Sequence, residues 1–157
     1  MFSLTHVGKL QMVNAVLSSL PTYFMCIVKL PSETLEQVDI YRKHCLWRGV
    51  DLNSKKPSLV AWDMVTRPKE QGGLGVLKLR TQNEALMLKN LHKFFNRADL
   101  PWVRLIWDSY YQNGKSPGQQ KRGSFWWKDI VKLINQYKGI AMPIVNDGKT
   151  VSLWDHL

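Results

Sequence analysis

The stretch RPKEQGGLGV, residues 67–76, decides how the fold of this chain is interpreted. It places Pro68 ahead of three glycines within four positions, Gly72, Gly73 and Gly75. Such a loop can offer backbone amides to a phosphate, or it can allow positive φ angles and a close backbone approach. The dinucleotide-binding pattern G-x-G-x-x-G fails here, because a lysine stands where the third glycine belongs and no βαβ unit is predicted around it. The pattern therefore favours an architectural loop between the apolar segments on either side.

The segments before this loop have helical periodicity. Residues 4–20 place apolar side chains on one predicted helical face, namely Val7, Leu10, Val13 and Leu17. Pro21 ends that pattern, and a short apolar segment follows at 23–30. A second helix is predicted from Ser32, as its N-cap, to Trp47, with its end near Gly49. Residues 50–58 are polar and are expected to form a loop.

The segments around and after the loop predict three more helices. Residues 59–65, LVAWDMV, are compatible with an extended segment or with one turn of helix. Thr81 to Glu84 matches a capping box, and the helix that it would open carries Leu88, Leu91 and Phe95 on one face. Pro101 suits the first position of a fourth helix, which carries Val103, Ile106, Trp107 and Tyr110. Ser124 is the expected N-cap of a fifth helix, which carries Trp127, Ile130, Val131 and Ile134.

The C-terminal part of the chain is predicted to end in a small β-hairpin. Residues 143–154, PIVNDGKTVSLW, would turn at 146–148, where Asn, Asp and Gly follow one another. The fold class is thus mainly α, with a glycine-rich connecting loop and a C-terminal hairpin. We expect a helical region at 1–112, a linker at 113–123, and a C-terminal helix plus hairpin at 124–157.

The composition favours a polyanionic partner. The 157 residues carry a formal net charge of +10 and have an isoelectric point near 9.8. Such a field favours nucleic acid first and an anionic membrane surface second. The basic residues are spread along the chain, so a solvated basic surface is the alternative. No apolar stretch is long enough to predict a membrane helix. Cys26 and Cys45 are expected to be reduced core residues of an intracellular protein.

The motifs of catalytic sites are missing from the sequence. Two turns contain Gly-Lys followed by Ser or Thr, at 114–116 and 148–150, but both lack the first glycine of a phosphate-binding P-loop. The four histidines have no carboxylate or cysteine at metal-ligand spacing. No adjacent pair of aspartates is present to hold two catalytic metal ions. We expect no enzymatic activity, no cofactor and no metal.

Five ordered stretches resemble the region that follows the polymerase palm in reverse transcriptases of LINE-type (non-LTR) retrotransposons of plants. They are LTHVGKLQMVNAVLSSLPTYFM (4–25), CLWRG (45–49), LVAWDMVTRPKEQGGLGV (59–76), LKLRTQNEALMLKNLHKF (77–94) and VNDGKTVSLWDHL (145–157). Their order and spacing agree with the family over nearly the whole chain. Lys9 replaces the usual Arg and Thr66 the usual Cys, and the chain ends before the family's zinc-binding Cys/His segment.

The resemblance implies a thumb and connection region that holds template and primer while a separate palm carries out the polymerase reaction. The implied partners are an RNA–DNA hybrid or duplex and the palm of the parent RNA-directed DNA polymerase, in the nucleus or cytoplasm. Thumb helices contact phosphates through Lys and Arg, largely without sequence preference. The residues that we expect to bind nucleic acid are Lys9, Arg42, Lys43, Arg67, Lys69, Lys78 and Arg80. Pro68 and the three glycines would set the path of the loop.

A second class of function is also compatible with the sequence. The chain could be a stand-alone helical module, derived from a decayed element, that docks another protein through exposed Trp and Tyr side chains. In that case the positive charge would serve solubility. Binding of nucleic acid distinguishes the two classes.

Overall fold

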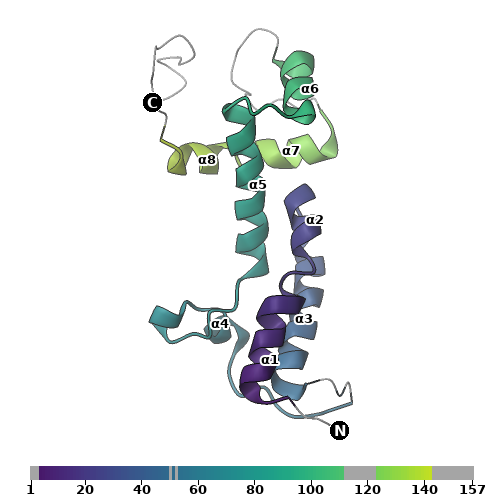
Figure 1. The fold of residues 1–157 in the computed structure, drawn as a ribbon, viewed down its shortest axis with the longest axis vertical. Helices are drawn as coiled ribbons and strands as arrows, with labels where there is room; N and C mark the ends of the chain where they lie inside the picture. Colours follow the sequence, from purple (N-terminus) through teal and green to yellow (C-terminus); the bar gives the residue numbers. More distant parts are fainter. Residues whose placement is uncertain (1–3, 50, 52, 112–122, 143–157) are drawn as a thin grey trace. The chain divides into compact units, whose positions relative to one another are not determined.

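The computed structural model describes residues 4–49, 51, 53–111 and 123–142 (Figure 1). The chain separates into two compact units, Met1–Leu86 and Met87–Leu157, and the division falls within helix α5 (Leu79–Phe95). Every regular element in the described ranges is helical, which confirms the mainly α fold class. The hairpin predicted at 143–154 and most of the linker predicted at 113–123 lie outside the described residues.

The first unit begins with α1 (His6–Met12), which continues into a π-helical turn, η1 (Val13–Leu17). The side chain of Thr5 caps α1 by accepting a hydrogen bond from the Gly8 amide. The buried positions are Lys9, Val13 and Ser18, whereas Val7 is 77% exposed, so the face predicted from Val7 is partly wrong. The wider π turn explains the five-residue step from Val13 to Ser18, which a regular α-helical period does not predict.

Helix α2 (Thr22–Ile27) occupies the short apolar segment that follows Pro21. Met25 is its only fully buried residue. The side-chain amide of Asn83 holds the end of α2, because its nitrogen donates to the carbonyls of Met25 (2.9 Å) and Val28 (3.0 Å). Its oxygen accepts from the Leu30 amide at 2.8 Å. One buried side chain therefore satisfies three backbone groups that the helix end leaves open.

Helix α3 (Ser32–Arg48) has nearly the predicted bounds. Its N-cap is Pro31, and Ser32 is the first helical residue, so the predicted Ser32 cap is wrong by one position. The Ser32 hydroxyl instead accepts a hydrogen bond from Arg80 at 2.7 Å. Gly49 ends the helix with φ of 79°, which confirms the predicted stop.

The segment at 59–65 forms one turn of helix, α4 (Trp62–Val65), rather than an extended strand. A 3₁₀ turn, η2 (Lys69–Gln71), opens the glycine-rich loop. The core beneath these turns consists of buried side chains from η1, α3, α4 and the loop, namely Val13, Cys45, Leu46, Val65 and Val76.

Helix α5 begins at Leu79, two residues before the predicted Thr81 cap. Leu79 is 1% exposed and packs with Met25 and Leu35. The Lys78 carbonyl already accepts from the Gln82 amide, so the helical hydrogen bonds start ahead of Thr81. Burial of Leu79 thus overrides the local capping-box signal.

The second unit packs the end of α5 with α6 (Pro101–Tyr110), α7 (Phe125–Val131) and α8 (Ile134–Ile140). Pro101 starts α6, and the Ser124 hydroxyl caps α7 by accepting from the Trp127 amide, as predicted. The predicted fifth helix is two helices, because the chain turns at residues 132–133 before Ile134. The core is rich in aromatic rings and includes Phe94, Tyr111 and Trp127.

The two cysteines differ in their surroundings. Neither forms a disulfide bond, but Cys26 is exposed, so its predicted place in the core is wrong, and Cys45 is buried. Burial raises the pKa of the Cys45 thiol, and the positive charge of Lys9 opposes this shift. Among the described helices, none combines the length and the apolar character that a membrane span requires.

Candidate nucleic-acid interface

The backbone of the glycine-rich loop is closed upon itself. Four successive amides donate to carbonyls within the same segment: Gly72 to Lys69 (3.0 Å), Gly73 to Pro68 (3.0 Å), Leu74 to Val65 (3.1 Å) and Gly75 to Arg67 (3.1 Å). A phosphate-binding loop needs such amides free and pointing toward the ligand. In this loop the four amides are already hydrogen-bonded to carbonyls, so the loop does not offer its backbone amides to a phosphate.

The three glycines serve this closed path in two ways. Gly72 and Gly75 have φ of 77° and 68°, in the left-handed region that favours glycine. Gly73 is excluded from carrying a side chain for another reason, since a Cβ there would lie 2.1 Å from the Arg67 carbonyl oxygen. Both features agree with the architectural interpretation of the loop.

Asp63, on α4, pairs with two of the residues that were predicted to bind phosphate. Its carboxylate accepts from Lys78 Nζ at 2.7 Å and lies 3.5 Å from a terminal nitrogen of Arg67. The hydrogen bond from Lys78, followed by its charge, lowers the pKa of Asp63, and Arg67 adds to the effect. The side chains of Arg67 and Lys78 remain 44% and 49% exposed, so both cations can still reach a ligand from solvent.

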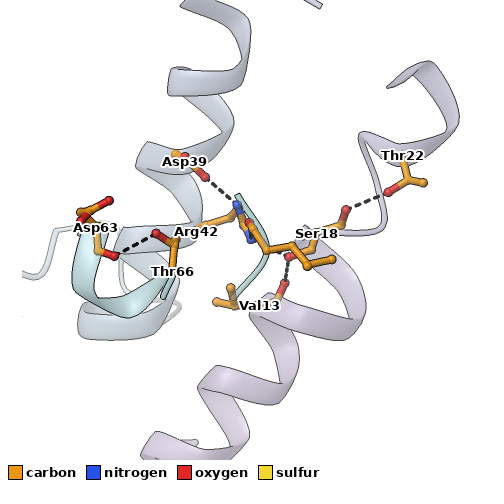
Figure 2. A network of polar contacts seen from close by, with 8 residues as sticks. Val13, Ser18, Thr22, Asp39, Arg42, Asp63 and Thr66 are labelled. Carbon is orange, nitrogen blue, oxygen red and sulfur yellow. Dashed lines mark hydrogen bonds and ion pairs between the residues drawn. The ribbon is translucent and has the colours of Figure 1, made fainter. Parts of the chain in front are cut away.

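Arg42 lies in the interior, not on the surface. Figure 2 shows it in a network of polar contacts with Asp39 and Ser18. Arg42 has no exposed area, and its terminal nitrogens donate to Asp39 (2.6 Å), to the Ser18 hydroxyl (2.9 Å) and to the Leu77 carbonyl (2.9 Å). The Ser18 hydroxyl in turn donates to the Val13 carbonyl at 2.7 Å. The prediction that Arg42 contacts phosphate is therefore wrong, because its guanidinium joins three segments of the first unit.

Lys9 is also withdrawn from the surface. It is 9% exposed, and its Cε and Nζ lie against Gly49 at the C-terminal end of α3. The negative end of the helix dipole stabilises a cation there. The prediction that Lys9 is exposed to bind phosphate is therefore wrong, because its ammonium group is buried against the end of α3, just as the Arg42 guanidinium is buried among its partners.

Four of the remaining predicted cations gather around α4 and the glycine-rich loop. They are Lys43, Arg67, Lys69 and Lys78, which we call the loop cation group. Lys43 Nζ lies 5.7 Å from the ring centre of Trp62, next to Asp63, and the stem of Lys69 packs over Gly75. Arg80 lies apart from this group, hydrogen-bonded to Ser32 at the start of α3.

Several residues that position this surface escaped the sequence prediction. Asn83 and Ser18 have hydrogen-bond partners on other segments, so no local pattern marks them, whereas Asp39 pairs with Arg42 three positions along the same helix. A polar residue among apolar helix positions was the available signal for Asn83. Among the described residues, no group of three or more His, Cys, Asp or Glu side chains could hold a metal ion.

The chain is similar to two proteins of Arabidopsis thaliana. One, described as a "putative ribonuclease H protein", is 33% identical over 109 residues, which make up 69% of this chain and 17% of that protein. The other, an "uncharacterized mitochondrial protein", is 25% identical over 141 residues, which make up 87% of this chain and 90% of that protein. The chain thus spans less than a fifth of the first relative. No family model and no solved structure matches it.

Proposed function

We propose that this chain is a non-catalytic, thumb-like fragment of a plant retrotransposon reverse transcriptase that binds template–primer nucleic acid through phosphate contacts. The observation that carries the proposal is the loop cation group, which consists of one cation on α3 and three cations on the segment between α4 and α5, where the loop backbone is closed by its own hydrogen bonds. A fixed loop lowers the entropic cost of presenting its cations to a phosphate backbone. The similarity to a protein described as a ribonuclease H protein supports an origin in an element that processes nucleic acid.

The mode of binding follows from the chemistry of the group. Lysine and arginine side chains on an exposed surface neutralise phosphates and release counterions, so affinity falls as salt rises. The closed loop amides add no specific phosphate pocket, and base edges are not addressed by these side chains. Binding should therefore be weak, salt-dependent and largely independent of sequence.

The test is a titration of the purified chain with a fluorescently labelled RNA–DNA hybrid at several salt concentrations. The logarithm of affinity should fall linearly with the logarithm of salt, with a slope of about −0.9 for each phosphate contact on a B-form duplex. Replacing Arg67 and Lys69 together by Gln should weaken binding and flatten the slope by up to about two contacts. A matched control replaces Lys55 and Lys56, two exposed cations of the polar loop.

Two results would contradict the proposal. Affinity that does not change between low and moderate salt would exclude binding by counterion release. An equal loss in the Lys55/Lys56 control would show that net charge, rather than the loop cation group, attracts the hybrid.

The second candidate is a protein-interaction module, and one observation favours it. Helix α2 exposes Tyr23 (71%), Phe24 (60%) and Ile27 (46%) while burying only Met25. Exposed aromatic side chains at this density are typical of docking surfaces. A chain that binds neither hybrid nor duplex in the titration would favour this function.

A further inference from the structure

The second unit holds a cleft whose lining contains no residue of the loop cation group. It has a volume of about 280 Å³ and lies where α5 ends and α6 begins. Its lining includes two arginines, Arg97 and Arg104, two aspartates, Asp99 and Asp108, and the ring of Trp107. This volume is at the small end of ligand sites, which suits a single planar group rather than a large molecule.

Arg97 is held in place by the backbone and by an aromatic ring. It has φ of 46° and ends α5, since its amide donates to the Phe94 carbonyl and the Ala98 amide donates to the Lys93 carbonyl. Glycine usually occupies this left-handed position, so an arginine there adds strain. The Arg97 guanidinium carbon lies 4.5 Å from the ring centre of Trp107, an attractive cation–π contact that offsets part of this cost.

Trp107 is itself a fixed platform. Its ring stacks on Phe94 with centroids 4.7 Å apart and planes 3° from parallel. Its indole nitrogen donates to the Phe94 carbonyl at 3.2 Å. The guanidinium of Arg97 is therefore held over the Trp107 ring in the lining of the cleft before any ligand arrives.

The cleft has unused hydrogen-bonding groups of both kinds. Arg104 forms an ion pair with Asp99 at the rim. Among the described residues, no acceptor bonds the Arg97 guanidinium and no donor bonds the Asp108 carboxylate. Because the lining charges balance, the cleft favours a neutral planar ligand with acceptors on one edge and N–H donors on another, rather than a phosphate.

We propose that this cleft binds one unpaired nucleobase, with guanine preferred, from a single-stranded segment of the bound nucleic acid. Guanine offers two neighbouring acceptors, O6 and N7, to which an arginine guanidinium can donate two hydrogen bonds at once. It also carries an exocyclic amino group, which can donate a hydrogen bond to a carboxylate such as that of Asp108. Stacking and base-edge contacts are the usual means of recognising single strands. This inference rests on the proposed function, since a bound strand must deliver the base.

The experiment compares a blunt RNA–DNA hybrid with hybrids that carry a short single-stranded extension of guanines or of uridines. The guanine extension should tighten binding by about tenfold relative to blunt or uridine-extended hybrids, as expected for one good bidentate contact. Arg97→Gly should abolish this preference and retain the fold, because glycine accepts the left-handed backbone. Asp108→Asn should reduce the preference. Lys128→Gln, an exposed charge change on α7, is the matched control and should retain it.

The outcomes separate failure of the inference from failure of the proposed function. Equal binding of blunt and guanine-extended hybrids overturns the nucleobase cleft and leaves the phosphate-binding function standing. A folded Arg97→Gly variant that keeps the guanine preference also overturns it. If no hybrid binds, the proposed function fails. In that case, titration with guanosine monophosphate tests the cleft directly. A shift of the Trp107 indole NMR signal would support nucleobase binding in the cleft, and an unmoved signal would overturn it.

Discussion

At two neighbouring glycines in the loop at 67–76, an added methyl group should lower the free energy of unfolding by different amounts. At Gly72, φ is 77° and no atom lies within 4 Å of an added Cβ. At Gly73, the Cβ would lie 2.1 Å from the Arg67 carbonyl oxygen and 2.5 Å from its carbon. Gly72→Ala therefore tests backbone conformation alone, and Gly73→Ala tests steric exclusion by the backbone.

The magnitudes follow from these two situations. Gly72→Ala should cost about 1 kcal/mol, the penalty for alanine in the left-handed region. Gly73→Ala must push the Arg67 carbonyl away, which costs about 1–3 kcal/mol in overpacking. That movement also weakens the Gly75–Arg67 and Gly73–Pro68 hydrogen bonds, each worth about 1 kcal/mol. The total for Gly73→Ala should thus be about 3 kcal/mol or more.

Urea unfolding followed by NMR signals of the first unit is the suitable assay. Because the chain has two compact units, a global signal could mix two transitions. With a urea dependence of about 1 kcal/mol per molar, Gly72→Ala should lower the midpoint by about 1 M and Gly73→Ala by roughly threefold more. Hybrid affinity of the folded fraction should not change in either variant.

Two results would refute this reasoning. If Gly73→Ala is no less stable than Gly72→Ala, the Arg67 carbonyl does not occupy the position that excludes a side chain. If either variant unfolds normally but loses affinity for the hybrid, the loop binds phosphate after all.

Three further predictions concern buried and paired polar groups. Arg42→Ala should destabilise the first unit by about 3–5 kcal/mol in urea unfolding, because its partners lose a buried cation, and Arg42→Met should cost less since it keeps the volume. Asn83→Leu should cost about 2–3 kcal/mol and remove the hydrogen-exchange protection of the Leu30 amide; unchanged protection would exclude the bond. The lowered pKa of Asp63 means that its stabilising effect is present above its unfolded pKa and is lost as pH falls through the folded value. Lys78→Met should raise that pKa in an NMR titration, and an unmoved pKa would show that the pair does not form.

The sequence predicted those features of the fold that depend on neighbouring residues. Gly49 stops α3, Pro101 starts α6 and Ser124 caps α7, and each signal acts within about one helical turn of its own position. Local chemistry decides these boundaries, so tertiary packing has little to override. The Thr81 capping box failed for the opposite reason, since the burial of Leu79 against a distant cluster moved the helix start.

The candidate site was harder to predict because exposure of a charge is a tertiary property. Arg42 has partners at Ser18 and Leu77, 24 and 35 positions away in the sequence. Nothing in the residues next to Arg42 distinguishes it from Lys43, which keeps a cation–π contact with Trp62 and remains partly exposed. The π turn that brings Ser18 toward Arg42 also lacks a sequence signal.

The distinction between Arg42 and the loop cation group determines how variants can be interpreted. A basic chain invites the removal of any Lys or Arg as a test of nucleic-acid binding. Removing Arg42 would disconnect three segments of the first unit, so lost affinity would report lost structure. Lys69 is different, because its stem packs over Gly75 and its side chain is exposed. Loss of affinity on replacing Lys69, with unchanged unfolding, therefore reports a contact with the ligand itself.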